Sequence, residues 1–152
     1  MSLNFSNSEA IEAFQAALRA RPDFAEVRGN MAQTHLNQAK ELSGAGKTAE
    51  ARQVLQQAIA AAPDHAEAHL ALGTLLARAG DLTAAIPELE MAVRLKPENA
   101  MAHFTLGKAL ANGGQMDAAR KQFQEALRLK PGAAPILQAL QSLPPESTAA
   151  PQ

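Results

Sequence analysis

The chain has 152 residues, of which 47% are hydrophobic and 3% aromatic, and it contains no Cys, Trp or Tyr. Fourteen basic and fifteen acidic residues leave a net charge of −1, which lacks the positive field that attracts nucleic acids or anionic membranes. Without cysteine, disulfide frameworks, thiolate metal sites and cysteine nucleophiles are excluded. Alanine is abundant and Val and Ile are scarce, so the composition favours helices over sheets.

The first predicted helix lies within residues 8–22, and we expect residues 1–7 before it to be flexible. Ile11, Phe14 and Leu18 form an apolar stripe on this helix, which Pro22 ends. Residues 1–7 leave no room for a helix that would cover the stripe. It is therefore expected to contact the following helix, a second copy of the chain, or repeats of a longer protein.

The second predicted helix is unusually long and runs from about residue 24 to about residue 43. Pro22 precedes Pro63 by 41 residues, seven more than the spacing of 34 between later prolines. Seven residues at about 1.5 Å each lengthen a helix by roughly 10 Å, about two turns. The next segment, SGAGKT at 43–48, resembles a phosphate-binding loop, but no strand precedes it and the motif's first glycine would fall on Glu41. We interpret it as a turn between helices.

A repeat of 34 residues covers residues 32–65, 66–99 and 100–133, which align without gaps. In each unit a glycine ends one helix and a proline ends the next, which predicts an antiparallel helix pair. Small residues predict close contact within the pair, and each pair must stack on its neighbours to bury its apolar face. The repeated columns are His35, His69 and His103; Leu42, Leu76 and Leu110; Gly46, Gly80 and Gly114; Ala51, Ala85 and Ala119; Leu55, Leu89 and Phe123; Ala58, Ala92 and Ala126; and Pro63, Pro97 and Pro131.

The last predicted helix, residues 134–143, closes the array. Pro135 lies near its start, and Ile136, Leu137 and Leu140 are predicted to share an inward face, with glutamines on the other. Two prolines end it, and residues 144–152 are polar enough to predict a disordered tail or linker.

The repeated columns resemble the tetratricopeptide repeat pattern of aromatic, Leu-Gly, aromatic, Ala, aromatic, Ala and Pro. The second unit carries His69, Leu72, Gly73, Leu76, Ala85, Leu89, Ala92 and Pro97 at those places; the third carries His103, Leu106, Gly107, Leu110, Ala119, Phe123, Ala126 and Pro131. The first unit departs from the pattern, with Gln38 and Ala39 in place of Leu and Gly. The resemblance implies an all-α fold, a right-handed α-solenoid of antiparallel helix pairs. It would span residues 8–143 as a half repeat, three full repeats and a capping helix.

The same resemblance implies a concave groove lined by the first helix of each unit. An apolar stripe flanked by cations would suit an extended peptide or amphipathic helix that carries apolar side chains and a carboxylate. The alternative is that these residues only pack against neighbouring helices. The expected groove residues are Gln33, Leu36, Lys40, Gly44, Glu67, Leu70, Thr74, Arg78, Met101, Phe104, Lys108 and Asn112.

Some members of the family clamp the C-terminal carboxylate of chaperones with Lys and Asn in the first unit, Asn in the second, and Lys and Arg in the third. The corresponding residues here are Leu36, Lys40, Ala71, Met101 and Thr105, and none matches. The sequence therefore argues against binding of chaperone tails.

No pattern of side chains predicts catalysis or metal binding. Histidines of neighbouring units would lie about 10 Å apart, too far to share one ion, so we expect half-buried rings between helices. His65 and His69 are four residues apart, but no carboxylate completes a zinc-protease pattern. No nucleophile is paired with a base.

The leading hypothesis is thus a non-catalytic scaffold that binds a protein or peptide of unknown identity, with no cofactor, no nucleic acid and no membrane insertion. One alternative is a homodimer formed through Ile11, Phe14 and Leu18. Another is the non-catalytic arm of a larger enzyme. The N-terminus shows no signal peptide, which favours the cytoplasm, while the periplasm stays open if the chain is a fragment.

Overall fold

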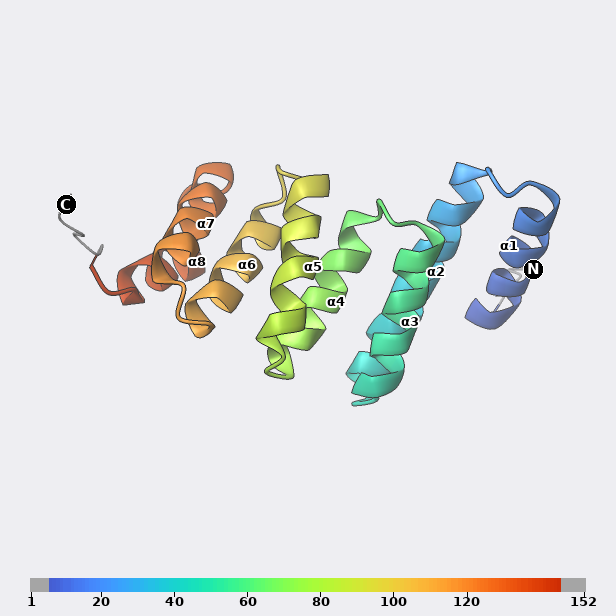
Figure 1. Ribbon diagram of the computed structural model, residues 1–152, viewed down its shortest axis with the longest axis horizontal. Coiled ribbons are helices and arrows are strands. Elements are labelled where there is room, and N and C mark those ends of the chain that lie inside the picture. The colour runs from blue at the N-terminus through green and yellow to red at the C-terminus, as the bar shows by residue number, and fades with distance from the viewer. Residues whose placement is uncertain (1–5, 146–152) are drawn as a thin grey trace.

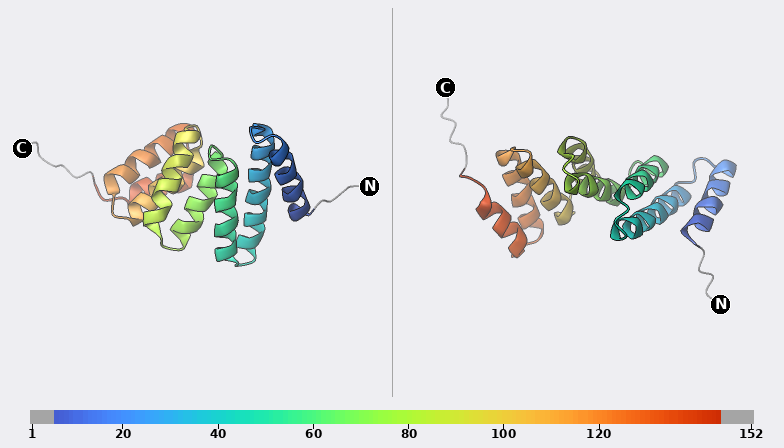
Figure 2. Two further views of the ribbon diagram at one scale, coloured as in Figure 1. Left: turned by 45° about the vertical axis from the view of Figure 1, so that its right-hand side comes forward. Right: turned by 90° about the horizontal axis from the view of Figure 1, so that it is seen from below.

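The computed structural model describes residues 6–145, and that range contains eight α-helices and no strand. Figures 1 and 2 show the helices following one another along the long axis, with α1 and α8 at opposite ends. The all-α prediction is confirmed. The helices are α1 (Asn7–Ala20), α2 (Ala25–Gly44), α3 (Thr48–Ala61), α4 (Ala66–Arg78), α5 (Leu82–Leu95), α6 (Ala100–Asn112), α7 (Met116–Leu129) and α8 (Ala134–Ser142).

Helix α1 begins earlier than the sequence predicts. Ser6 forms a capping box with Glu9, in which Ser6 N–H donates to Glu9 Oε2 (2.9 Å) and Ser6 Oγ accepts from the Glu9 amide (3.4 Å). These bonds satisfy amides that the first turn of a helix leaves unpaired, so α1 begins at Asn7, one residue before the predicted half repeat. Expectations for residues 1–5 and 146–152 lie outside the described residues.

The predicted long helix is confirmed. Helix α2 has 20 residues against 13 in α4 and 13 in α6, and the additional residues lie at its N-terminus. Helix α1 packs against it. Ile11, Phe14 and Leu18 are consequently half-buried, and α2 is one of the contacts expected for their stripe.

Glycine turns join the two helices of each unit. Gly46, Gly80 and Gly114 have φ angles of 76°, 84° and 78°, a left-handed conformation that glycine adopts without steric penalty. The residue after each glycine donates its amide proton to the carbonyl of the leucine five residues earlier, with N···O distances of 2.9 to 3.0 Å. These leucines are Leu42, Leu76 and Leu110. The segment 43–48 is therefore a turn between helices, as predicted.

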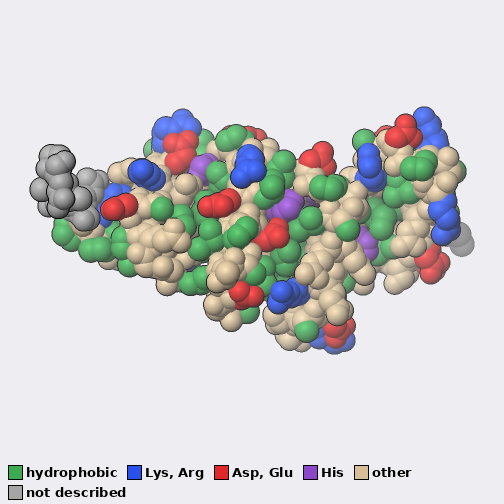
Figure 3. All heavy atoms as spheres, in the orientation of Figure 1, with side chains coloured by type: hydrophobic (Ala, Val, Ile, Leu, Met, Phe, Trp, Pro, Cys, Tyr) green, Lys and Arg blue, Asp and Glu red, His purple; other side chains and the backbone are tan. Residues whose placement is uncertain are grey.

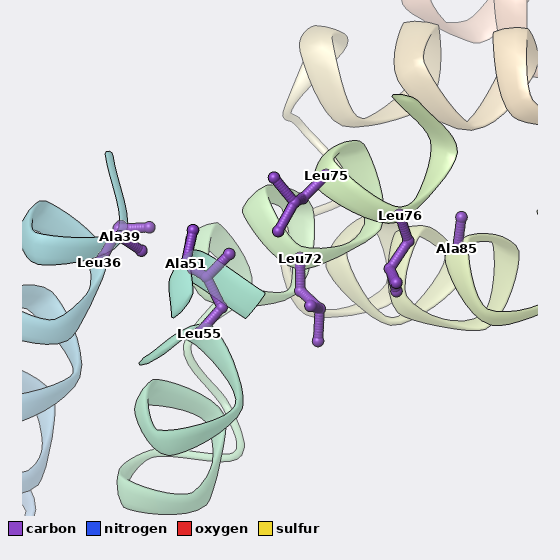
Figure 4. Close-up of a cluster of buried hydrophobic side chains, with 8 residues drawn as sticks. All are labelled: Leu36, Ala39, Ala51, Leu55, Leu72, Leu75, Leu76 and Ala85. Carbon is purple, nitrogen blue, oxygen red and sulfur yellow. The ribbon is translucent and has the colours of Figure 1, made fainter. Parts of the chain in front are cut away.

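The helices of a pair approach closely because small residues lie opposite large ones. A Cβ atom on Gly73 would lie 2.6 Å from Leu89 Cγ, and one on Gly107 would lie 2.6 Å from the Phe123 ring. In the first unit Ala39 replaces the glycine and is buried with Leu55 in the core. Figure 4 shows the residues of this core cluster, which come from α2 to α5.

Helix α8 covers the C-terminal end of the core. Ile136 is buried in one cluster with Leu106 and Phe123, as predicted. Leu137, however, is an exposed residue, which corrects the expectation that it shares the inward face. Helix α8 has a single buried residue, Ile136.

Candidate functional site

The first helices of the units line the concave side of the array. Helix α2 contacts α4, and α4 contacts α6, more extensively than the second helices of the units contact one another. The side on which successive helices lie closer is the inner side of the curve. Two pockets open on this side, one between α2 and α4 and one between α6 and α8.

The pocket between α2 and α4 has a volume of about 270 Å³ and an apolar floor. It brings together four residues that the sequence assigned to the groove: Leu36, Lys40, Thr74 and Arg78. Lys40 and Arg78 are exposed at its edge. Leu36 lines the pocket from the core, since it is only 2% exposed, although an exposed position was expected. The other lining residues, which the sequence analysis missed, are Ala39, Ser43, Leu55, Ala71 and Leu75.

The pocket between α6 and α8 is larger, about 500 Å³. Met101, 60% exposed, and Phe104, half-buried, form part of its lining, as the groove prediction requires. Ile136 and Pro135 of α8 line the opposite wall, and Lys130 lies at its border. From the sequence, α8 was expected only to close the array and not to line the groove. The 34-residue register places Pro135 one repeat after Met101, and this signal could have revealed that α8 continues the groove.

Phe104 is held in position by aromatic and cationic neighbours. Its ring centroid lies 5.8 Å from that of Phe123, with the rings tilted by 47°. The Lys108 ammonium lies 5.7 Å from the Phe104 centroid, within the range of a cation–π contact. A cation therefore lies beside the aromatic ring.

The remaining predicted residues do not meet at either pocket. The side-chain amide of Gln33 donates to Asn37 Oδ1 (3.1 Å), and Leu70 packs against the C-terminal core cluster. Gly44 and Asn112 are exposed at the ends of α2 and α6.

Glu67 forms an ion pair with Lys96, which lies near the end of the same unit. Lys96 Nζ lies 2.9 Å from Glu67 Oε1, and both side chains are partly exposed. The ammonium group lowers the pKa of the Glu67 carboxyl below its ordinary value, and the carboxylate raises the pKa of Lys96. Lys96 also borders the pocket between α6 and α8, so Glu67 offsets part of the positive charge there.

The histidine column is more deeply buried than predicted. All three rings are buried, whereas half-buried rings were expected: His35, His69 and His103. His69 Nε2 donates to the Pro63 carbonyl oxygen and His103 Nε2 to that of Pro97, each at 2.9 Å. These rings hold the loops between units in place.

Within residues 6–145, no group of three or more His, Asp and Glu side chains is placed to hold a metal ion. In the same range, no helix is both long and apolar enough to cross a bilayer. Figure 3 shows acidic and basic side chains interspersed over one face of the molecule.

The sequence matches a family model described as tetratricopeptide repeat at residues 36–100 and 84–134, which together exceed half of the chain. No curated protein matches it.

The fold is similar to that of many solved structures, among which are the following three. One is the first repeat domain of Spaghetti (RPAP3) bound to the HSP90 peptide SRMEEVD, with a TM-score of 0.72, 18% identity, and coverage of 74% of this chain and 90% of that chain. The second is MamA, with a TM-score of 0.64, 25% identity, and coverage of 88% and 74%. The third is the O-GlcNAc transferase of Thermobaculum terrenum (mutant K341M), with a TM-score of 0.66, 24% identity, and coverage of 91% of this chain but 22% of that one.

Proposed function

Because the chain belongs to the tetratricopeptide repeat family, whose fold supports protein–protein interaction, we propose that it is a non-catalytic module that binds a partner peptide or helix in its concave groove. The observation that carries this proposal is the pocket between α6 and α8. An exposed Met and a half-buried Phe line it together with Lys96 and Lys130, and Glu98 is the acidic residue of the same lining. Exposed apolar groups next to cations suit a ligand with an apolar side chain beside a carboxylate.

The pocket between α2 and α4 provides a second contact region of the same kind. Its floor is apolar, and no ion pair joins Lys40 or Arg78 to an acidic residue within residues 6–145. An acidic ligand spanning both pockets would meet cations at each. The peptide in the RPAP3 complex is itself acidic and contains Met. The family's carboxylate clamp is absent here, because none of its five positions carries the required residue. We therefore propose a ligand other than a chaperone tail, either a different tail or an internal segment. The five positions are Leu36, Lys40, Ala71, Met101 and Thr105.

We predict that Phe104→Ala weakens ligand binding by about 1 kcal/mol or more, roughly fivefold in Kd, without unfolding the domain. Peptides selected from a displayed random library on the full chain provide the ligand, and fluorescence anisotropy measures its Kd. Leu137→Ala is the matched control, because it removes an exposed apolar side chain of α8 outside the pocket.

The charge requirement is tested separately. The double substitution Lys40→Glu and Arg78→Glu is expected to weaken the binding of acidic peptides but not the binding of neutral ones. Unchanged affinity of the selected peptides for both this variant and Phe104→Ala would contradict the groove assignment.

Self-association through α1 is a second candidate, because none of the α1 side chains is fully buried. In α3, by contrast, three residues are buried: Ala51, Leu55 and Ala58. Light scattering of the purified chain tests this candidate, and a monomer at high concentration would exclude it.

The chain could instead serve as the non-catalytic arm of a larger enzyme. The similar segment of the O-GlcNAc transferase forms 22% of that chain, which favours considering this arrangement. Determining the full-length gene product tests it directly.

A further inference from the structure

Two of the three buried histidines have a complete set of hydrogen-bond partners. In the second unit, His69 Nε2 donates to the Pro63 carbonyl (2.9 Å) and Nδ1 lies 2.7 Å from Glu88 Oε2. In the third unit, His103 Nε2 donates to the Pro97 carbonyl (2.9 Å) and Nδ1 lies 2.8 Å from Gln122 Oε1. Each ring thus binds the extended loop before its helix on one side and a polar side chain on the other.

His35 lacks both partners. It is 4% exposed, and neither ring nitrogen makes a hydrogen bond of standard geometry within residues 6–145; the Gln38 side chain is its polar neighbour. Val54 occupies the position of Glu88 and Gln122. Gly29 occupies the position of Pro63, but it lies inside α2, where backbone carbonyls are used by the helix itself. The N-terminal extension of α2 has therefore replaced the loop that supplies the carbonyl in the other units.

A pocket lies beside this histidine, between α1, α2 and α3, and we call it the α1–α3 pocket. Its volume is about 650 Å³, within the usual range of ligand sites. Four of its residues form one stripe on α2: Arg28, Met31, His35 and Gln38. Ile11 and Leu18 of α1 line the opposite wall, and Gln57 comes from α3. The pocket thus combines apolar walls with a buried imidazole that lacks the carbonyl and the polar side chain bound by His69 and His103, and such a group calls for a specific acceptor.

The two complete units show which chemical group fits the ring. In both, the acceptor is the carbonyl oxygen of a proline in an extended segment, and the next residue is acidic: Asp64 after Pro63, and Glu98 after Pro97. Burial lowers the pKa of His35, with Gln38 opposing the shift, so the ring is neutral near pH 7 and has one N–H to donate.

Arg28 supplies a cation for the acidic residue. It lies seven residues before His35, about 10 Å along the helix. Glu12 lines the same pocket and Asp64 borders Arg28 in an adjacent one, but no ion pair joins either carboxylate to Arg28 within residues 6–145. An arginine side chain spans most of the distance between two turns and can reach a carboxylate bound near the histidine.

We propose that the α1–α3 pocket binds a short extended peptide in which an acidic residue follows a proline. The proline carbonyl accepts a hydrogen bond from His35, and the acidic side chain pairs with Arg28. This site is distinct from the concave groove, because none of its residues lines either groove pocket.

The probe is acetyl-Ala-Ala-Pro-Asp-amide, the sequence of residues 61–64, titrated into the full chain at neutral pH. NMR of labelled methionine methyl groups separates the two sites, since Met31 lines the α1–α3 pocket and Met101 lines the groove. The proposal predicts saturable shifts of the Met31 methyl and the His35 ring at millimolar peptide, while Met101, His69 and His103 stay unshifted. No saturable shift at Met31 and His35, or shifts confined to Met101, would overturn it and leave the groove proposal untouched.

Charge reversal provides the matched control. Arg28→Glu is expected to raise the Kd for the Asp peptide at least tenfold. The variant, but not the original chain, is expected to bind acetyl-Ala-Ala-Pro-Lys-amide. His35→Phe keeps an aromatic ring but removes the donor, and is expected to raise the Kd roughly tenfold with unchanged helix content. If Arg28→Glu binds both peptides as the original chain does, or His35→Phe leaves the Kd unchanged, the assignment is wrong.

Discussion

At the residue scale, one repeated histidine serves two different roles, which depend on its neighbours. His69 and His103 bind the proline carbonyl before their helix, and so tie successive units together. His35 stands in the same column with Val54 where the others face Glu88 and Gln122. Because a buried polar group without a partner costs free energy, the first unit is expected to carry a local weakness.

This weakness predicts a specific dependence of stability on pH. Burial holds the pKa of His35 below its ordinary value of 6.5, so the unfolded chain binds a proton that the folded chain does not. The contribution to the free energy of unfolding is complete above pH 6.5 and is lost as the pH falls toward the pKa in the folded state.

Val54→Glu is expected to reduce this acid sensitivity, because it places beside His35 the carboxylate that His69 has in Glu88. Urea unfolding between pH 8 and pH 5 measures the free energy of unfolding at each pH. The slope of this free energy against pH is then compared between the chains, and not their absolute stability. Val54→Gln, which copies Gln122 and adds no charge, is the control and should retain more of the slope. Equal slopes for all three chains would contradict the account.

At the scale of helices, each pair depends on a small residue opposite a large one. Gly73 faces Leu89, Gly107 faces Phe123, and Ala39 accompanies Leu55 in the first unit. The glycine costs helix propensity but removes a Cβ atom that would overlap the partner side chain. Close contact between the backbones is the physical reason for the Leu-Gly places in the repeat.

Two glycine substitutions should therefore have opposite signs. Gly107→Ala is expected to lower the free energy of unfolding by about 1–3 kcal/mol, since its Cβ would overlap the buried Phe123 ring. Gly29→Ala, also within a helix, meets no atom within 4 Å and should raise it by about 0.5–1 kcal/mol. Urea unfolding measures both, and stabilisation by Gly107→Ala would refute the packing argument.

At the scale of the whole molecule, stability is distributed along a line of neighbouring helices. In such an array each unit contacts only adjacent ones, so the two ends determine where it opens first. Helix α1 has no buried residue, whereas α8 places Ile136 in a cluster with Leu106 and Phe123. The N-terminal end is accordingly the weaker one.

Removal of residues 133–152 is expected to destabilise the chain more than removal of residues 1–22. Loss of the Ile136 contact alone accounts for roughly 1.5–3 kcal/mol. Urea unfolding of both truncated chains and the full chain measures the difference. A larger loss from the N-terminal truncation would show that α1 stabilises the array through contacts other than burial.

The order of the helices, the long second helix and the glycine turns could be predicted from the sequence. These features depend on local properties, namely proline without an amide donor, glycine at positive φ and apolar residues at helical spacing, and a repeat displays each of them three times. The family resemblance led us to expect Met101 and Phe104 in the groove, and both residues line the pocket between α6 and α8; that a ligand binds there stays a prediction.

The tertiary structure decided four features: the burial of Leu36, the exposure of Leu137, the wall that α8 adds to the groove, and the loss of the usual partners of His35. Each depends on the distance between helices that are far apart in the register, and a linear pattern does not contain that distance. The sequence determined a stack of helix pairs with one side suited to binding, because such pairs bury their apolar faces only by stacking. Where that side is open, and which polar groups remain without partners, followed only from how the particular side chains fill the space between the helices.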